Sequence, residues 1–209
     1  MTPSLFNSFM SVTILTYQFE GSYLRSYLDI KDIKYTVDTS TLDRGLKLGQ
    51  LIRVCQHKEL NKIGKHRQSL ASSLKKDSKK CKELGTNIYN YVRNIVPTKA
   101  SDILCTTFKD AWKKVKGKGY TTSFLSHNTK ATNDYAHKTT LVYGLNRYMD
   151  VPVKKYLESQ GVDVNESLWA LNEMLQWIFR SAIRNGEPID IYVPNTRMRE
   201  LLLEWIEHN

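Results

Sequence analysis

The sequence predicts an α/β fold in which helices and strands alternate. Apolar residues recur at helical spacing up to Ala182, and Asn185–Gly186 then supplies a helix stop. Residues 189–193 alternate apolar and polar side chains, as a half-buried strand does, and Pro194 ends that strand. A further amphipathic helix begins near Thr196. Helix, strand and helix at such short spacing are typical of layered α/β domains.

The N-terminal segment predicts two strands with a helix between them. Residues 11–19 are rich in β-branched and aromatic side chains, which favour a strand. Residues 20–28 have a helical pattern, and residues 33–37 form a second short run of strand type. We therefore expect residues 1–40 to begin the α/β lobe.

The C-terminal half, residues 97–209, is predicted to hold the remainder of that lobe. Residues 100–108 favour a strand that leads into a helix over 108–115. Residues 138–149 are predicted as a helix with Leu141, Leu145 and Tyr148 on its buried side. Asp163 and Glu166 are expected to form a capping pair at the start of the next helix, which carries the apolar stripe up to Ala182.

Between these parts, residues 41–96 are predicted to form a basic helical insertion or connector. Apolar residues there follow a three-to-four spacing, and glycines divide the segment into two or three helices. The chain has a formal net charge of +10, and from Arg44 to Lys82 it holds twelve basic and two acidic residues. A second run of lysines follows at residues 109–118.

A basic block of this kind favours a polyanionic partner, of which nucleic acid is the commonest. DNA is favoured over RNA as that partner. A solvated, lysine-rich helical hairpin is the alternative interpretation. The residues predicted to contact nucleic acid are Lys75, Lys76, Lys79, Lys80, Lys113, Lys114, Lys116 and Lys118.

Several classes of protein are disfavoured by composition. No apolar run approaches the roughly 18 residues of a membrane span, so no membrane partner is expected. The first six residues lack a basic region of signal-peptide type. Three widely spaced cysteines suit a reduced cytoplasmic protein without disulfides, and neither they nor the five histidines show metal-ligand spacing. We expect a cytoplasmic protein without a metal site.

The most distinctive local pattern is the run Gln176-Trp177-Ile178-Phe179-Arg180-Ser181-Ala182-Ile183-Arg184. Its glutamine and two arginines recur every four residues, so a continuous helix would place them on roughly one face. Guanidinium groups on a rigid element suit phosphate recognition, because each presents a fixed fork of donors that stays protonated. The alternative is a solvated basic helix whose arginines pair with Glu173 or Glu187.

With its flanks, this run resembles the C-terminal end of superfamily 2 helicase-like proteins carried by phages and other mobile elements. The resemblance rests on residues 171–203, with further similarity in Ala131–Tyr135, Leu145–Tyr148 and Val12–Glu20. It covers about two thirds of the chain and is weakest from Asp38 to Ser101. It implies the second, RecA-like lobe of such a protein, with a parallel sheet flanked by helices.

The resemblance also implies roles for individual residues. The last helicase motif has the pattern Q-x-x-G-R-x-x-R, and Gln176 and Arg180 match its first two polar positions. Phe179 replaces the usual glycine, and Arg184 falls one residue late, which puts the role of Arg184 in doubt. By resemblance, Arg180 and Arg184 would be arginine fingers that stabilise the transferring phosphoryl group. Gln176 would contact the nucleotide, as would a motif containing Thr132 and Asn133, for which an Asn/Thr-rich surface turn is the alternative.

The chain lacks the phosphate-cradling loop that the first lobe of a helicase supplies. Gly117-Lys118-Gly119 has no hydroxyl residue to reach magnesium, and Gly64-Lys65-His66 fails for the same reason. ATP and Mg²⁺ are therefore expected only in an assembly with a first lobe that carries a Walker A loop. Whether the chain acts as part of an enzyme stays open, and alone it is not expected to bind or hydrolyse ATP. Three functions remain. The first is a helicase second lobe, the second is a non-enzymatic nucleic-acid-binding module of phage or mobile-element origin, and the third is a protein-interaction domain whose lysines only keep it soluble.

Overall fold

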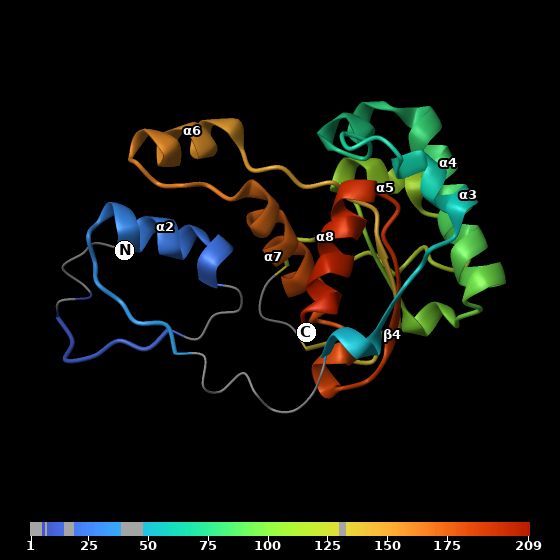
Figure 1. The fold of residues 1–209 in the computed structure, drawn as a ribbon. Coiled ribbons are helices and arrows are strands. Elements are labelled where there is room, and N and C mark those ends of the chain that lie inside the picture. The colour runs from blue at the N-terminus through green and yellow to red at the C-terminus, as the bar shows by residue number, and fades with distance from the viewer. Residues whose placement is uncertain (1–5, 7, 15–18, 39–47, 130–132) are drawn as a thin grey trace. The chain divides into compact units, whose positions relative to one another are not determined.

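The structure is a computed structural model of the 209-residue chain. It describes residues 6, 8–14, 19–38, 48–129 and 133–209. The chain divides into two compact units (Figure 1). Unit 1 combines residues 1–44 with 149–172, and unit 2 combines residues 45–148 with 173–209.

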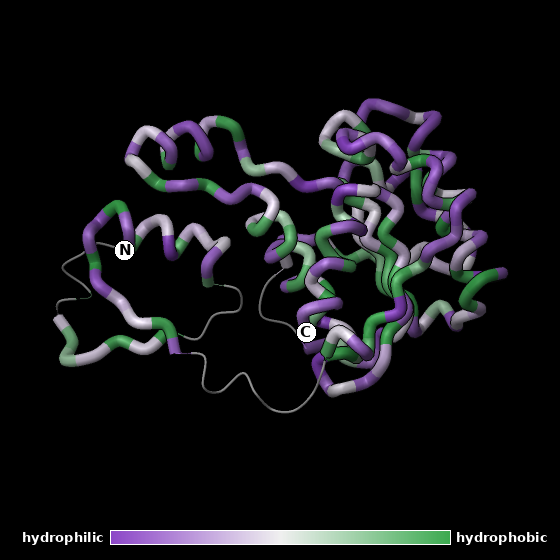
Figure 2. The backbone as a smooth tube through the Cα atoms, in the orientation of Figure 1, coloured by the Kyte–Doolittle hydropathy of each residue, from purple (hydrophilic) through white to green (hydrophobic). Residues whose placement is uncertain are grey.

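Unit 2 is built on a four-stranded parallel sheet whose strand order is β1-β4-β3-β2. The strands are β1 (Ile52–Val54), β2 (Ile103–Thr106), β3 (Thr140–Tyr143) and β4 (Ile189–Tyr192). Every residue of β2 and β3 is buried, as expected for parallel strands covered on both faces. Figure 2 shows the same pattern, with hydrophobic residues concentrated in the strands and polar residues on the outer helices.

Helices cover both faces of this sheet (Figure 1). The helices of unit 2 are α3 (Lys58–Asn61), α4 (Ser78–Asn90), α5 (Lys109–Val115), the second half of α7 (Glu166–Ile178) and α8 (Thr196–Glu207). Tyr192 points to the side of α3 and α4, since its hydroxyl donates to the Leu60 carbonyl at 2.5 Å. Tyr143 points to the other side, where its ring meets that of Trp177 at 5.6 Å. The two tyrosines thus mark the two faces of the sheet.

Shorter turns of helix join these elements. They are the 3₁₀ turns Leu48–Leu51, Lys62–Gly64, Ser72–Lys76, Ala100–Asp102 and Ala182–Asn185, and a π turn at Tyr91–Ile95. Gly64 lets its turn approach the end of β4, because a Cβ there would lie 2.0 Å from the Pro194 carbonyl oxygen. At the sheet edge, Arg53 of β1 makes a two-pronged ion pair with Asp190 of β4, with N–O distances of 2.8 and 2.6 Å.

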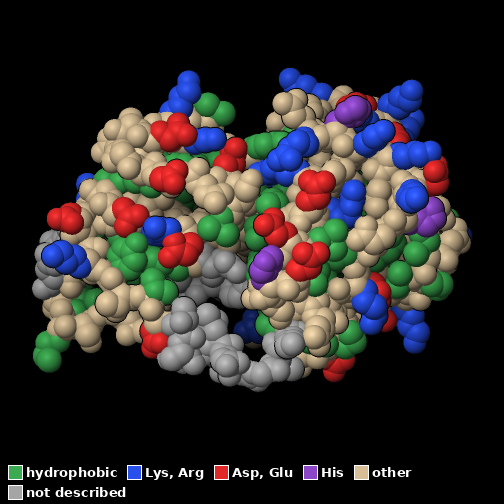
Figure 3. Space-filling model, in the orientation of Figure 1, with side chains coloured by type: hydrophobic (Ala, Val, Ile, Leu, Met, Phe, Trp, Pro, Cys, Tyr) green, Lys and Arg blue, Asp and Glu red, His purple; other side chains and the backbone are tan. Residues whose placement is uncertain are grey.

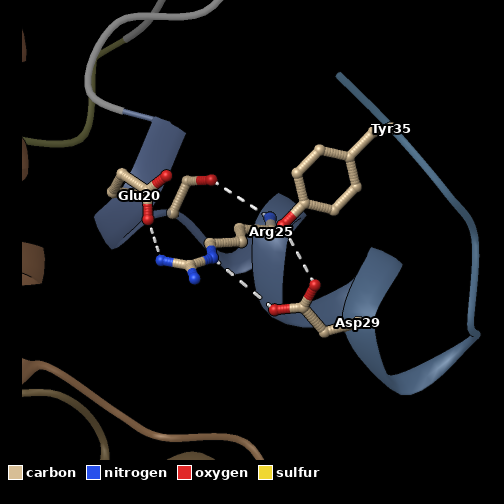
Figure 4. Close-up of polar contacts among 5 residues, drawn as sticks. Glu20, Arg25, Asp29 and Tyr35 are labelled. Carbon is tan, nitrogen blue, oxygen red and sulfur yellow. Dashed lines mark hydrogen bonds and ion pairs between the residues drawn. The ribbon is translucent and has the colours of Figure 1, made fainter. Parts of the chain in front are cut away.

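Unit 1 is helical in its described part. It contains the 3₁₀ turn Phe19–Gly21, α2 (Tyr23–Ile30), α6 (Val151–Ser159) and the start of α7. Figure 4 shows Arg25 of α2 between the carboxylates of Glu20 and Asp29, and Tyr35 donating to Asp29 at 3.1 Å. The start of α7 is capped by Asn165, whose side chain accepts from the Leu168 amide at 2.9 Å. The cap is therefore Asn165, and the predicted opening of this helix by Asp163 is wrong.

The predicted α/β class, a parallel sheet flanked by helices, is confirmed. The strand and helix predicted for 100–108 and 108–115 are present as β2 and α5. The strand predicted at 189–193 and the helix from Thr196 are present as β4 and α8. The segments of β4 and α8 carry the clearest periodicity and turn signals.

Three other predicted elements differ from the structure. Residues 11–14 and 33–37 form no strand, and residues 15–18 lie outside the described part of the chain. Val12 and Ile14 are 47% and 41% exposed, so strand propensity without a pairing partner did not produce a strand here. The helix predicted over 138–149 is instead β3 and its following loop.

The predicted division into domains also differs. Residues 41–96 are not an insertion outside the sheet, because they contain β1, which pairs with β4. A strand of three residues is too short to show its own period within a helical pattern. Residues 1–44 fall in unit 1 together with 149–172, and in their described part, residues 8–14 and 19–38, they add no strand to the sheet.

Candidate nucleic-acid interface

Helix α4 carries the first lysine run on its outer side. Its cap is Asp77, whose carboxylate accepts from the Lys80 amide at 2.9 Å. Cys81, Leu84 and Ile88 are buried at a spacing of three and four residues, which fixes the inner face of the helix. The lysines that precede and begin α4 are therefore directed to solvent; these are Lys75, Lys76, Lys79, Lys80 and Lys82.

Helix α5 carries the second lysine run. Ala111, Trp112 and Val115 are buried, and the ring of Trp112 stacks on that of Phe124 with centroids 5.1 Å apart. The lysines of α5 and the loop after it are all exposed, namely Lys109, Lys113, Lys114, Lys116 and Lys118, and Asp110 is exposed beside them. We call these five lysines and the five of the previous run the lysine surface.

The tertiary structure joins the two runs. The Lys114 ammonium donates to the Ser78 hydroxyl at 2.9 Å, so the start of α4 lies against α5. The Lys75 ammonium lies 5.2 Å from the ring centroid of Phe108, the residue before α5. Two segments about thirty residues apart in the sequence thus form adjoining parts of one surface.

A buried tyrosine fixes the contact between the helices. The Tyr120 hydroxyl lies 2.9 Å from the Gly85 carbonyl of α4 and 2.8 Å from the Val115 carbonyl of α5, and it donates to these acceptors. Gly85 permits the approach, because a Cβ there would lie 2.6 Å from the Val115 carbonyl oxygen. Burial, and secondarily the nearby Cys105, raises the pKa of Tyr120, so the hydroxyl stays protonated as a donor.

The lysine surface carries a strong net positive charge. Residues 75–82 and 109–118 hold ten lysines and two aspartates, a net charge of +8. Figure 3 shows Lys and Arg side chains standing out along the side of unit 2 where Figure 1 labels α3 and α4. Exposed ammonium groups at this density repel one another, and a polyanion that supplies phosphates would relieve the repulsion.

The segment predicted as an arginine-bearing helix has a different structure. Helix α7 ends at Ile178, where the Ser181 hydroxyl donates to the Ile178 carbonyl at 2.7 Å and the backbone turns into an extended conformation. Gln176 is therefore on α7, Arg180 lies in a turn and Arg184 lies on the 3₁₀ turn that follows. The prediction that one helical face carries all three residues is wrong, because a local side-chain hydrogen bond competes with the helix.

These arginines lie at the amino-terminal end of the sheet. The Ala182 amide donates to the Lys138 carbonyl at 2.9 Å, just before β3 begins. Arg184 and Gln176 are exposed, while Arg180 is half-buried and its pKa is lowered by burial and then by Arg184. The Arg180 Nε is enclosed and has no hydrogen-bond acceptor among the described residues.

Thr132 lies outside the described residues, and Asn133 is exposed in the turn before β3. We call residues 176–185 the arginine segment. The Asn185 side chain donates to the Ala136 carbonyl at 3.3 Å, which ties the turn before β3 to this segment. The structure therefore brings Asn133 and Arg184 to the same end of the sheet. In open α/β sheets ligands bind at the opposite, carboxyl end, so this location does not match the usual site.

The carboxyl end of the sheet holds a buried polar cluster to which the sequence analysis assigned no function. Asn146 follows β3 and donates to the carbonyls of Arg67 and Ser69, at 2.6 and 3.1 Å. Asn195 follows β4 and donates to the same Ser69 carbonyl at 2.8 Å. Arg197, 4% exposed, donates to the Asn146 side chain at 3.2 Å. An asparagine shortly after each of two apolar strand segments is the signal that could have predicted this cluster.

The polar cluster closes the sheet end by holding a loop over it. Its asparagine donors are satisfied by backbone carbonyls of residues 66–69, and the Tyr148 hydroxyl adds a bond to the Arg67 carbonyl at 3.2 Å. Nearby, burial and the charge of Arg147 lower the pKa of His127 to about 4, so this imidazole is neutral at physiological pH. The arrangement is that of a structural clamp.

In the part of the chain that the structure describes, no helix is long and apolar enough to cross a membrane.

The parallel sheet covered by helices on both faces defines unit 2 as a Rossmann-like α/β domain. Residues 46–206 match the family described as the YonV C-terminal Rossmann-like domain, and the chain belongs to that family.

A curated relative extends this comparison. The "SPbeta prophage-derived uncharacterized protein YonV" of Bacillus subtilis (strain 168) is 43% identical over 220 residues, which cover 98% of this chain and 54% of the relative. The chain thus spans about half the length of the curated relative it matches. No solved structure gives a significant match. The relative agrees with the expected phage association, and neither description names a helicase.

Proposed function

We propose that this Rossmann-like domain is a non-enzymatic module that binds nucleic acid through the lysine surface. The observation that carries the proposal is the junction of α4 and α5, where the Lys114 ammonium meets Ser78 and two lysine runs adjoin. Lysine ammonium groups bind phosphates as mobile point charges, which suits a partner whose phosphates repeat along a backbone. The prophage-derived relative supports a role on phage or mobile-element nucleic acid.

The test is binding of the full chain to short DNA and RNA by fluorescence anisotropy over a range of salt concentrations. Log affinity should fall linearly with log salt, with a slope of about −0.9 per duplex phosphate contact and about −0.7 per single-strand contact. The variant Lys79→Glu/Lys80→Glu/Lys113→Glu/Lys114→Glu should lose on the order of a hundredfold in affinity at low salt.

The matched control reverses four exposed lysines outside the surface, namely Lys31, Lys34, Lys65 and Lys155. It changes net charge equally, so it should bind several times more tightly than the surface variant. Equal losses in both variants would mean that only net charge matters, and absence of binding by the wild-type chain at low salt would refute the proposal.

A second candidate function is the helicase second lobe. It is favoured by the tie between the Asn133 turn and the arginine segment, and by the enclosed Arg180 Nε without an acceptor among the described residues. In this proposal a Walker A-containing first lobe supplies the ATP and Mg²⁺ cradle, and Arg180 and Arg184 reach the transferring phosphate. The absence of a continuous arginine-bearing helix weighs against it.

The helicase proposal predicts nucleic-acid-stimulated ATPase when the chain is mixed with the half of the Bacillus relative that it does not cover. Arg180→Ala or Arg184→Ala should then reduce turnover about 10³-fold or more, the range for arginine fingers. Circular dichroism would confirm that both variants fold. Full turnover in both variants, or no ATPase in the mixture, would exclude this function.

A further inference from the structure

The lysine surface contains a hollow between α4 and α5. Its volume is about 470 Å³, and it is shallow and open to solvent. One wall is a stripe of α4, and the other is the end of α5 with its following loop. The lining residues on the two sides are Lys82, Gly85, Thr86 and Tyr89, and Lys114, Val115, Lys116, Gly117 and Tyr120.

The position of Tyr89 distinguishes this hollow from a simple basic patch. Lys82, Thr86 and Tyr89 are spaced by four and three residues, so they share one face of α4 beside the buried face of Cys81, Leu84 and Ile88. Tyr89 is 45% exposed, and no ring partner is assigned to it within the described residues. The exposed part of the ring is open to a ligand, and burying it against a ligand would be favourable.

The surroundings of the ring specify the chemistry of that ligand. Three lysines, Lys82, Lys114 and Lys116, line the same hollow as Tyr89. A planar base can stack on an aromatic side chain while flanking phosphates pair with lysines, which is the common mode of single-strand binding. Bases in a duplex are already stacked and paired, so they could not enter the hollow without unstacking.

We propose that the hollow binds an unstacked base of single-stranded nucleic acid on the Tyr89 ring, with Lys82, Lys114 and Lys116 on the flanking phosphates. This inference rests on the proposed nucleic-acid-binding function and adds a preference for single strands. Tyr120 is a positioning residue here, because its buried hydroxyl bonds the Gly85 carbonyl on one wall and the Val115 carbonyl on the other.

The experiment measures affinities of the full chain for labelled oligothymidylate and for a duplex of the same length. Wild type should prefer the single strand. Tyr89→Ala should weaken single-strand binding about fivefold or more, the effect of losing one base–aromatic stack, and leave duplex binding within about twofold. Tyr89→Phe should keep the preference, because stacking requires the ring and not the hydroxyl.

Tyr156→Ala is the matched control, since Tyr156 is a 56% exposed tyrosine on a helix outside the lysine surface. It should leave both affinities unchanged. Retained salt-sensitive binding with an unchanged single-strand preference in Tyr89→Ala would overturn this inference and leave the proposed function standing. If the wild-type chain bound neither the single strand nor the duplex, the proposed nucleic-acid-binding function itself would be refuted.

Discussion

Two basic regions of unit 2, the lysine surface and the arginine segment, differ in how closeness in sequence relates to closeness in the structure. The lysines come from two runs about thirty residues apart, and packing of α4 on α5 makes them adjoin. Gln176, Arg180 and Arg184 are close in sequence at regular spacing, yet the end of α7 at Ile178 places them on three different elements. Regular spacing places side chains on one face only if a single helix extends over all of them.

For the comparison of these two basic sets, the largest expected effect comes from removing two charges from each. Lys79→Gln/Lys114→Gln and Arg180→Gln/Arg184→Gln each remove two positive charges. The lysine pair should lose roughly tenfold in affinity for a short oligonucleotide at low salt, because two phosphate contacts are lost. The arginine pair should change it by less than about twofold. Anisotropy titrations of both variants at one salt concentration make the comparison.

A larger loss in the arginine pair would reverse the assignment and place the nucleic-acid contacts at the amino-terminal end of the sheet. Thermal unfolding of both variants provides the control. Arg180 is half-buried, so a folding defect in the arginine variant would have to be excluded first.

A smaller effect tests whether the joining of α4 and α5 matters apart from charge. Tyr120→Phe removes the hydroxyl that donates to the Gly85 and Val115 carbonyls and changes no charge. It should cost about 1–2 kcal/mol in the free energy of unfolding, since a buried hydrogen bond is lost and carbonyls are left unsatisfied. Urea unfolding measures this cost.

The same variant should weaken binding only slightly, through the looser placement of the two lysine runs. Arg184→Ala is the contrasting variant, because Arg184 is exposed on a short turn. Its unfolding free energy should stay within about 0.5 kcal/mol of wild type. Equal costs in the two variants would mean that Tyr120 does not hold the helices together.

The sequence by itself determined the α/β class and the elements with strong local signals. β4 and α8 were predicted because alternation, Pro194 and the helical stripe from Met198 to Trp205 are all local patterns. Leu141 and Leu145 fit a helical stripe, so the sequence predicts a helix over the β3 segment. In the structure Leu141 is buried in β3 and Leu145 in the loop that follows. Short apolar runs carry too few residues to distinguish the two periods.

The sequence predicts eight of the ten lysines of the lysine surface as nucleic-acid contacts, but it does not predict the shape of that surface. Sequence composition identified both lysine runs, because charge clustering is visible along the chain. The two runs adjoin, and the hollow with Tyr89 forms, because Gly85 allows α5 to pack closely against α4. The Tyr120 hydroxyl bonds carbonyls of both helices. Close packing between distant segments is decided by which side chains fit together in three dimensions, and no spacing rule in a single sequence contains that information.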